Sequence, residues 1–409
     1  MKNEFNPVRK RFVIGLIGAL LFSGAVLPTP AQAAKPCNKI GATSIVVQNG
    51  KKITLDCLQV GKNKEWTQQN STISKSDLDA LVAKYLKQDL EFPRPVSAVK
   101  PGIRNAAVVT AGLASSGPAR VAVELKIALA KIGWTSKDAY DGKFLPTEQS
   151  ALIQKVVLEK VDAIFLVAIT PSAVQAGIDA AKAAGIVVAC ILCGPDLPEG
   201  MININVDASG AGRGQAEYAV KNSKSTGTIF VYQNLEFATS TLQTAVAAQR
   251  VKYLCPKCTV VTPTLTLAES RTTGAAIWTS LLRDYPNGKL DFVILPFDSP
   301  AGALAQTAQQ LGRTDFGIVG YGALAPFVDM VGIGSPNVAK ASITISTPYY
   351  AWAAVDQVAR TFAKVPLWDG SKMPFGLITK GNYSKYPSGA PFVYPKFDYT
   401  KDFPKLWGK

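Results

Sequence analysis

Two similar stretches, residues 161–192 and 291–321, constrain the fold of this chain more than any other feature of its sequence. In the first stretch, residues 163–169 form an unbroken apolar run. The run is too short for a buried helix, so it predicts a strand that is covered on both faces. Pro171 can open the helix that follows, and Gly185 can end it before the next apolar run. Each stretch therefore predicts one strand–helix–strand unit of a parallel sheet.

The two units also share their spacing. Asp162 stands nine residues before Pro171, and Asp291 stands nine residues before Pro300. This repetition predicts an α/β protein with two doubly wound parallel-sheet lobes of similar build. Because ligands of open parallel sheets bind beyond the carboxyl ends of the strands, we expect the ligand in the cleft between the lobes.

Further strands and helices are expected to alternate along the rest of the chain. A helix over 74–90 and a proline-rich linker over 92–102 precede the lobes. Strands are predicted at 106–110, 186–192, 202–204, 228–233, 259–264, 292–295, 316–321, 341–346 and 375–379. Helices are predicted up to residue 132 and over 147–159, 239–254, 269–284, 299–311 and 348–364.

The first 33 residues have the features of a secretory signal peptide. A basic start precedes an apolar segment, and Ala31-Gln32-Ala33 fits the small-residue cleavage pattern, which predicts a cut after Ala33. No cysteine stands at this cut to carry a lipid, and no later segment reaches the roughly 18 apolar residues that span a bilayer. We expect an exported protein of the extracellular space or cell envelope. An uncleaved membrane anchor is the alternative.

Composition excludes several classes of function. The chain has no histidine, which removes Ser–His–Asp and Cys–His nucleophile pairs and every His-ligated metal site. Its net charge is +15, and +12 without the signal segment, but the basic residues are scattered. Nucleic-acid binding requires a clustered basic face. We therefore predict no enzyme, no metal, no cofactor and no nucleic-acid partner.

Six cysteines in an exported chain favour disulfides, and they form three sequence-local pairs: Cys37 with Cys57, Cys190 with Cys193, and Cys255 with Cys258. The first pair would close a loop of about 20 residues in a small β module, residues 34–69, and would stabilise it by about 3 kcal/mol. Two alternatives remain for the other pairs, namely a shared four-thiolate zinc site or a thioredoxin-like redox site.

Several ordered stretches carry a family pattern. They are residues 128–134 with Asp141-Gly142, residues 161–168 with Pro171, residues 180–188, and residues 316–321. Over about residues 104–380, this ordered set resembles the type I periplasmic solute-binding proteins of sugar-type ABC transporters. The module with Cys37, Gly41-Ala42-Thr43, Cys57 and Trp66 resembles a two-cysteine segment at the start of secreted actinobacterial proteins.

The resemblance implies two lobes joined by crossovers near Val206, Ser346 and residues 366–372. On this division the first lobe holds residues 104–206 and 347–370, and the second lobe with the tail holds residues 207–346 and 371–409. Residues 70–103 form the helix and linker before them. The family's lobes close on a small ligand like a hinge. The closed form, a monomer, then docks on a membrane permease.

Candidate ligand-binding residues follow predicted strands on the cleft side. Their polar members are Ser115, Ser116, Thr170, Gln233, Asn234, Glu236, Asp298 and Tyr321, and their aromatic members are Phe237, Phe297 and Tyr349. Ordinary loop capping is the alternative role for the polar ones. Cys193-Gly194 stands where the family's ribose binders carry an Asp-Arg pair. A sugar is therefore what the resemblance implies, while the aromatic faces also suit other flat ligands.

Two other functions fit the sequence. A secreted thiol–disulfide oxidoreductase would use one C-x-x-C pair, and a ligand sensor would report to a membrane receptor. The glycines of Gly210-x-Gly212-x-Gly214 do not have the spacing of a dinucleotide-binding loop. We expect them to allow close packing at a helix start.

Overall fold

The computed structural model describes residues 43–48, 51–60, 63–68, 75–87, 90–387 and 392–409, with side chains from residue 78 onward. The predicted signal peptide and the Cys37–Cys57 bond lie outside the described residues. Within the described residues, no helix combines the length and the apolar character that a bilayer crossing requires.

The first lobe is built on a parallel sheet of order β5-β4-β7-β8-β9, with β6 beside β4. Its strands are β4 (Asn105–Thr110), β5 (Thr135–Ser136), β6 (Tyr140–Asp141), β7 (Ala163–Val167), β8 (Val187–Ile191) and β9 (Ile202–Ile204). All five residues of β7 are buried, as the apolar run predicted. One face of the sheet packs against α2 (Ser116–Ile132) and α11 (Thr347–Ala363). The other packs against α3 (Pro146–Leu158), η1 (Pro171–Val174) and α4 (Gln175–Ala183).

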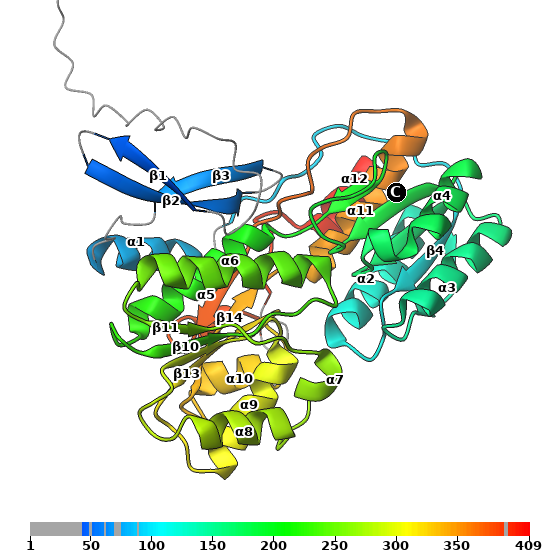
Figure 1. The fold of residues 1–409 in the computed structure, drawn as a ribbon. Helices are drawn as coiled ribbons and strands as arrows, with labels where there is room; N and C mark the ends of the chain where they lie inside the picture. Colours follow the sequence, from blue (N-terminus) through cyan, green and yellow to red (C-terminus); the bar gives the residue numbers. More distant parts are fainter. Residues whose placement is uncertain (1–42, 49–50, 61–62, 69–74, 88–89, 388–391) are drawn as a thin grey trace, which may run out of the picture.

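The second lobe repeats this design with the sheet order β11-β10-β12-β13-β14-β15. The strands are β10 (Thr228–Val231), β11 (Thr259–Val261), β12 (Phe292–Ile294), β13 (Gly317–Tyr321), β14 (Ala339–Thr344) and β15 (Gly376–Thr379), of which only β15 is antiparallel to its neighbour. The helices are α5 (Ala208–Asn222), α6 (Ala238–Leu254), α7 (Leu267–Ser270), α8 (Ala276–Asp284), α9 (Asp298–Gln310) and α10 (Phe327–Ile333). The two lobes confirm the predicted fold class (Figure 1).

The predicted helix over 269–284 is wrong, because two helices occupy this part of the chain. Thr266 and Glu269 form a capping box that starts α7. The chain then leaves the helical path, and Gly274 adopts a φ of +74° before α8 begins. The short helices α10 and α12 (Tyr399–Leu406) were not predicted, since so few residues show little periodicity.

The glycines at the start of α5 allow close packing, as expected. A Cβ atom on Gly212 would stand 2.2 Å from the carbonyl oxygen of Gln243 on α6. The carboxylate of Asp207 accepts a hydrogen bond from the Gly210 N–H at 2.8 Å and caps the helix.

The N-terminal module is an antiparallel meander of β1 (Thr43–Gln48), β2 (Lys51–Val60) and β3 (Asn63–Gln68). Figure 1 shows it above α6 of the second lobe. The following helix, α1 (Lys75–Tyr85), packs on α5, and the Tyr85 ring stacks on Phe375 with centroids 5.1 Å apart. The module and α1 therefore belong with the second lobe.

Three connections join the lobes. The chain passes at residues 205–207, at 345–346 and at 364–375, and the first and third are paired. The Met373 N–H donates to the Asn205 carbonyl at 2.7 Å, and the Asp207 N–H donates to the Met373 carbonyl at 3.0 Å.

The N-terminal and C-terminal segments make two further connections between the lobes. After α1, the chain leaves the second lobe, and Phe92 packs edge-on against Tyr349 of α11 in the first lobe. After β15, the tail also returns to the first lobe, where α12 packs on α11 and the Trp407 ring stacks on Trp352 at 5.8 Å.

A buried ion pair on α11 holds these segments together. Asp356 and Arg360 are 0% and 1% exposed, and the Arg360 Nε donates to the carboxylate at 2.6 Å. The indole N–H groups of Trp368 and Trp407 donate to the same carboxylate at 2.8 and 3.0 Å. Arg360 also donates to the carbonyl and hydroxyl of Ser97. The pair thus connects the linker, the third crossover and the tail.

We expect Asp356→Asn to lower the free energy of unfolding by roughly 3 kcal/mol, because it leaves the Arg360 charge buried without a counterion. Urea unfolding followed by circular dichroism measures this change. Asp138→Asn is the control, since Asp138 pairs with Lys126 on the surface, where ion pairs contribute little. Equal stability of Asp356→Asn and the wild type would contradict the role of the buried pair.

Candidate functional site

A cavity of about 90 Å³ lies between the lobes, at the carboxyl ends of strands from both sheets. The first lobe contributes the start of α2, the ends of β7 and β8 and, at the crossover, the start of α11. The second lobe contributes the starts of α6 and α9 and the loop after β13. The sequence predicted a ligand at this position, beyond the carboxyl ends of the parallel strands and between the lobes.

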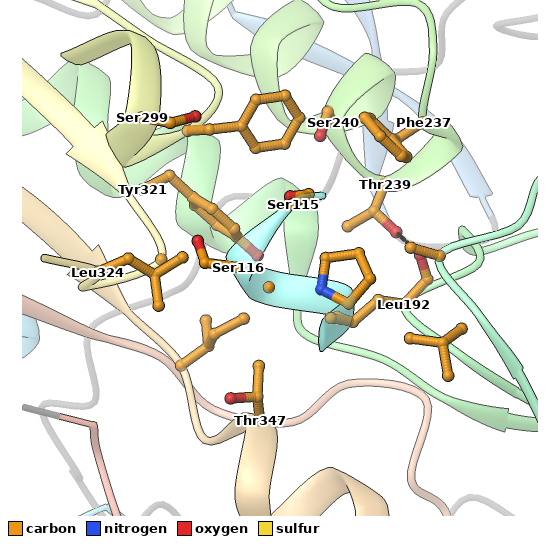
Figure 2. Close-up of a pocket in the computed structure, with 17 residues that line it drawn as sticks. Ser115, Ser116, Leu192, Phe237, Thr239, Ser240, Ser299, Tyr321, Leu324 and Thr347 are labelled. Atoms are coloured by element: carbon orange, nitrogen blue, oxygen red, sulfur yellow. Dashed lines mark hydrogen bonds between the residues drawn. The ribbon is translucent and has the colours of Figure 1, made fainter. Parts of the chain in front are cut away.

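Hydroxyl groups are the polar side-chain groups of the cavity wall. They belong to Ser115, Ser116, Thr239, Ser240, Ser299, Tyr321 and Thr347 (Figure 2). Among the described residues, no charged side chain lines this cavity. Tyr321 and Thr347 are 7% and 4% exposed, and among the described residues neither the Tyr321 Oη nor the Thr347 Oγ1 has a hydrogen-bond partner. Both oxygens line the cavity and are free to form a hydrogen bond with a ligand there.

Apolar groups form the rest of the wall. The rings of Phe237 and Phe297 meet edge to face with centroids 5.5 Å apart. Phe144 of the first lobe packs on the same Phe237 ring at 6.0 Å. Thr239 of the second lobe donates a hydrogen bond to the Leu192 carbonyl of the first lobe at 2.9 Å. The lobes therefore touch each other directly at the cavity.

The backbone is strained around this cavity. Ala168, Leu192 and Ala323 have φ values of +57°, +60° and +53°, a left-handed conformation that is unfavourable for residues with a Cβ atom. Ala168 and Leu192 line the cavity, and Ala323 stands between two residues that do. Such strain is concentrated at functional sites in many proteins.

The structure brings five of the predicted ligand residues to the cavity wall: Ser115, Ser116, Phe237, Phe297 and Tyr321. Other predicted residues have structural partners outside it. Tyr349 is fully buried under the C-terminal tail and donates to the Pro93 carbonyl. Thr170 is half-buried and precedes η1.

Three predicted residues after β10 stabilise their own loop. The Gln233 side chain donates to the Thr244 carbonyl at 3.1 Å. The Asn234 amide donates to Glu236 at 2.7 Å, and the Leu267 N–H donates to the same carboxylate at 2.8 Å. These residues therefore hold the segment that leads to α7 and do not line the cavity.

Asp298 positions the wall without being part of it. Its carboxylate accepts hydrogen bonds from the Leu324 N–H at 2.7 Å and from the Ser342 hydroxyl at 2.8 Å. Asp298 is 1% exposed, and burial raises the pKa of its carboxyl group to about 7. The residue thus fixes the loop from Tyr321 to Leu324, which lines the cavity.

Four of the hydroxyl residues in the cavity wall were not among the predicted ones: Thr239, Ser240, Ser299 and Thr347. Each lies in the first turn of a long helix that follows a strand. A search for small polar residues in the first turns of these helices would have found them.

Both C-x-x-C pairs form disulfides, with S–S distances of 2.02 Å for Cys190–Cys193 and 1.99 Å for Cys255–Cys258. Cys190 and Cys193 are 0% and 1% exposed. Thiol exchange requires an accessible sulfur, so this burial is unfavourable for the redox alternative. The bond instead fixes the loop that places Leu192 at the cavity.

We predict that the wild type loses stability relative to Asp298→Asn as the pH rises from about 4 to 7. Because the carboxyl group has a raised pKa in the folded protein, it ionises first in the unfolded chain as the pH rises. This ionisation stabilises the unfolded chain relative to the folded protein over this range. Urea unfolding of both proteins at several pH values measures the difference, which should be on the order of 2–4 kcal/mol. Parallel pH curves would contradict the prediction.

The chain can now be compared with known proteins. A family described as the periplasmic binding protein domain matches residues 107–363. No curated protein sequence matches the chain significantly.

Solved structures with similar folds include an ABC transporter solute-binding protein from Agrobacterium vitis with bound allitol. It shares 19% identity at a TM-score of 0.63, over 70% of this chain and 98% of that one. The Caulobacter myo-inositol binding protein, with myo-inositol bound, shares 15% identity at a TM-score of 0.62. The match covers 69% of this chain and 95% of that one. An ABC sugar transporter subunit from Rhodobacter sphaeroides shares 21% identity at a TM-score of 0.60. The match covers 68% of this chain and 99% of that one.

Proposed function

The chain belongs to the periplasmic binding protein family, and we propose that it captures one small solute between its two lobes and delivers it to an ABC transporter permease. The observation that carries the proposal is the cavity at the carboxyl ends of both sheets, with two buried hydroxyl groups that lack partners. A binding protein needs a concave site that contacts both lobes, and this cavity has that form.

A sugar or a polyol is the ligand class that we propose first. Hydroxyl side chains can both donate to and accept from the hydroxyls of such a ligand. Phe237 and Phe297 supply apolar surface for the face of a ring. Allitol and myo-inositol, bound by two proteins of similar fold, belong to this chemical class.

The remaining parts of the proposal concern export and partners. We infer that residues 1–33 direct export, that the mature protein acts outside the membrane as a monomer, and that the permease docks on the closed lobes. The division into lobes at residues 206, 346 and 366–372 belongs to the same proposal. The proposed function includes no catalytic step. A sensor subunit would use the same cavity, and its partner would be a receptor.

Thermal melting of the mature protein against allitol, myo-inositol, D-allose and D-fucose tests this function. A ligand present at 100 times its Kd should stabilise the protein by about 2.7 kcal/mol, which gives a clear rise in Tm. Titration calorimetry of each hit should show one site per chain. Absence of binding by every member of a wider panel of sugars, polyols and small acids would overturn the proposal.

Tyr321→Phe should weaken the binding of such a hit about 2- to 10-fold, because it removes one hydrogen bond. The Tm of the free protein should not fall, since the lost hydroxyl has no partner in the protein. Tyr386→Phe is a matched control: its hydroxyl is also buried and unpartnered but lies away from the cavity. An equal effect of both variants would show that Tyr321 does not contact the ligand.

A further inference from the structure

Four long helices begin at the wall of the cavity. They are α2, α6, α9 and α11, with 17, 17, 13 and 17 residues, and a residue from the first turn of each lines the cavity. The residues before them, Ser115, Phe237, Phe297 and Ser346, make no side-chain capping bond. Each helix start therefore presents the positive end of its dipole to the same space, with the N–H groups of those first-turn residues that are not proline; Pro118, Pro300 and Pro348 have none.

Three of these four positive ends have no negative side chain to compensate them. No acidic residue stands in the first turn of α2, α6 or α11. The exception is α9, whose first turn contains Asp298, with its carboxylate hydrogen-bonded to Ser342 and Leu324. In contrast, α5 begins away from the cavity and is capped by Asp207.

Two hydroxyl groups give an independent indication of a ligand. The Tyr321 Oη and the Thr347 Oγ1 are buried at the cavity without partners, and each can donate a hydrogen bond. Figure 2 shows Tyr321 and Thr347 on different sides of the residues at the start of α2. The ligand must therefore offer acceptors to donors that come from several directions.

The wall combines N–H donors at the helix starts with hydroxyl groups that can donate or accept, and no carboxylate lines it among the described residues. A neutral sugar brings several O–H donors that need acceptors, whereas a carboxylate only accepts. A cation would meet no negative side chain among the described residues of the wall.

We infer that the solute bound in this cavity is a small monocarboxylate, whose carboxylate faces the helix starts and whose ring lies against Phe237 and Phe297. This inference rests on the proposed function and specifies the charge of the ligand. The net charge of +12 without the signal segment favours the approach of an anion. Two sources share the required chemistry, a sugar acid and a carboxylic acid with an apolar ring.

Titration calorimetry with matched pairs tests the inference. D-Glucuronate is compared with D-glucuronamide, and benzoate with benzamide, so that each pair differs at one group only: a charged carboxylate that accepts hydrogen bonds is replaced by a neutral amide that also donates them. At least one carboxylate should bind about 10-fold more tightly, or better, than its amide, because the starts of α2, α6 and α11 act on the same charge without an acidic residue of their own. The pair that binds distinguishes a sugar acid from an apolar acid.

Ser115→Asp provides a second test within the protein. The extended backbone of Ser115, with φ −96° and ψ 129°, suits an aspartate cap on α2. The cap would occupy the free N–H groups and add a negative charge, so the carboxylate should bind at least about 10-fold more weakly while the Tm of the free protein stays the same or rises. Ser115→Asn is the control, because it caps the helix without a charge and should lose much less affinity.

The outcomes separate the inference from the proposed function. Binding of neutral sugars or polyols, with no preference for either carboxylate over its amide, would overturn the inference and leave the binding function intact. An equal loss of affinity in Ser115→Asp and Ser115→Asn would also overturn it. If neither the carboxylates nor the neutral sugars and polyols bind, both the inference and the proposed function fail.

Discussion

The parallel arrangement of the strands is the constraint on which the rest of this structure depends. In each lobe every parallel strand ends at the same edge of its sheet, and the helix that follows must begin there. The two sheets turn these edges toward one cavity, where the starts of α2, α6, α9 and α11 meet. The positive helix ends and the strained residues Ala168 and Leu192 are thus consequences of one topology.

The Asp356–Arg360 pair adds a second constraint, on how the lobes are joined. It binds Ser97 of the linker and Trp407 of the tail to α11 in the first lobe. Both segments come from the second lobe, where α1 and β15 lie. A hinge motion about the paired crossovers at 205–207 and 370–373 must therefore also bend these two segments. They make opening of the cleft more costly than in a protein with only three connections.

The sequence predicted most strands and the position of the cleft, because unbroken apolar runs and helix-breaking residues are local signals. It predicted the side-chain roles less well, because a residue that follows a strand can point in several directions. The role of Asp298 depends on Ser342, which is 44 positions away. The role of Tyr349 depends on Pro93 and on the tail. Thr347 was not predicted: its Oγ1 has no hydrogen-bond partner among the described residues, and its place in the first turn of a helix is the one sequence signal that could have indicated it.

The loop after β8 explains how a cavity without charged side chains can still select a ligand. The Cys190–Cys193 bond closes this loop. Leu192 faces the cavity there, and its carbonyl accepts the bond from Thr239 that joins the lobes. The loop is thus apolar and held from both sides, so it offers no ionic group to a ligand. The proposed recognition therefore uses groups whose positions are set by folding: the hydroxyls, the two phenylalanine rings and the N–H groups of the helix starts.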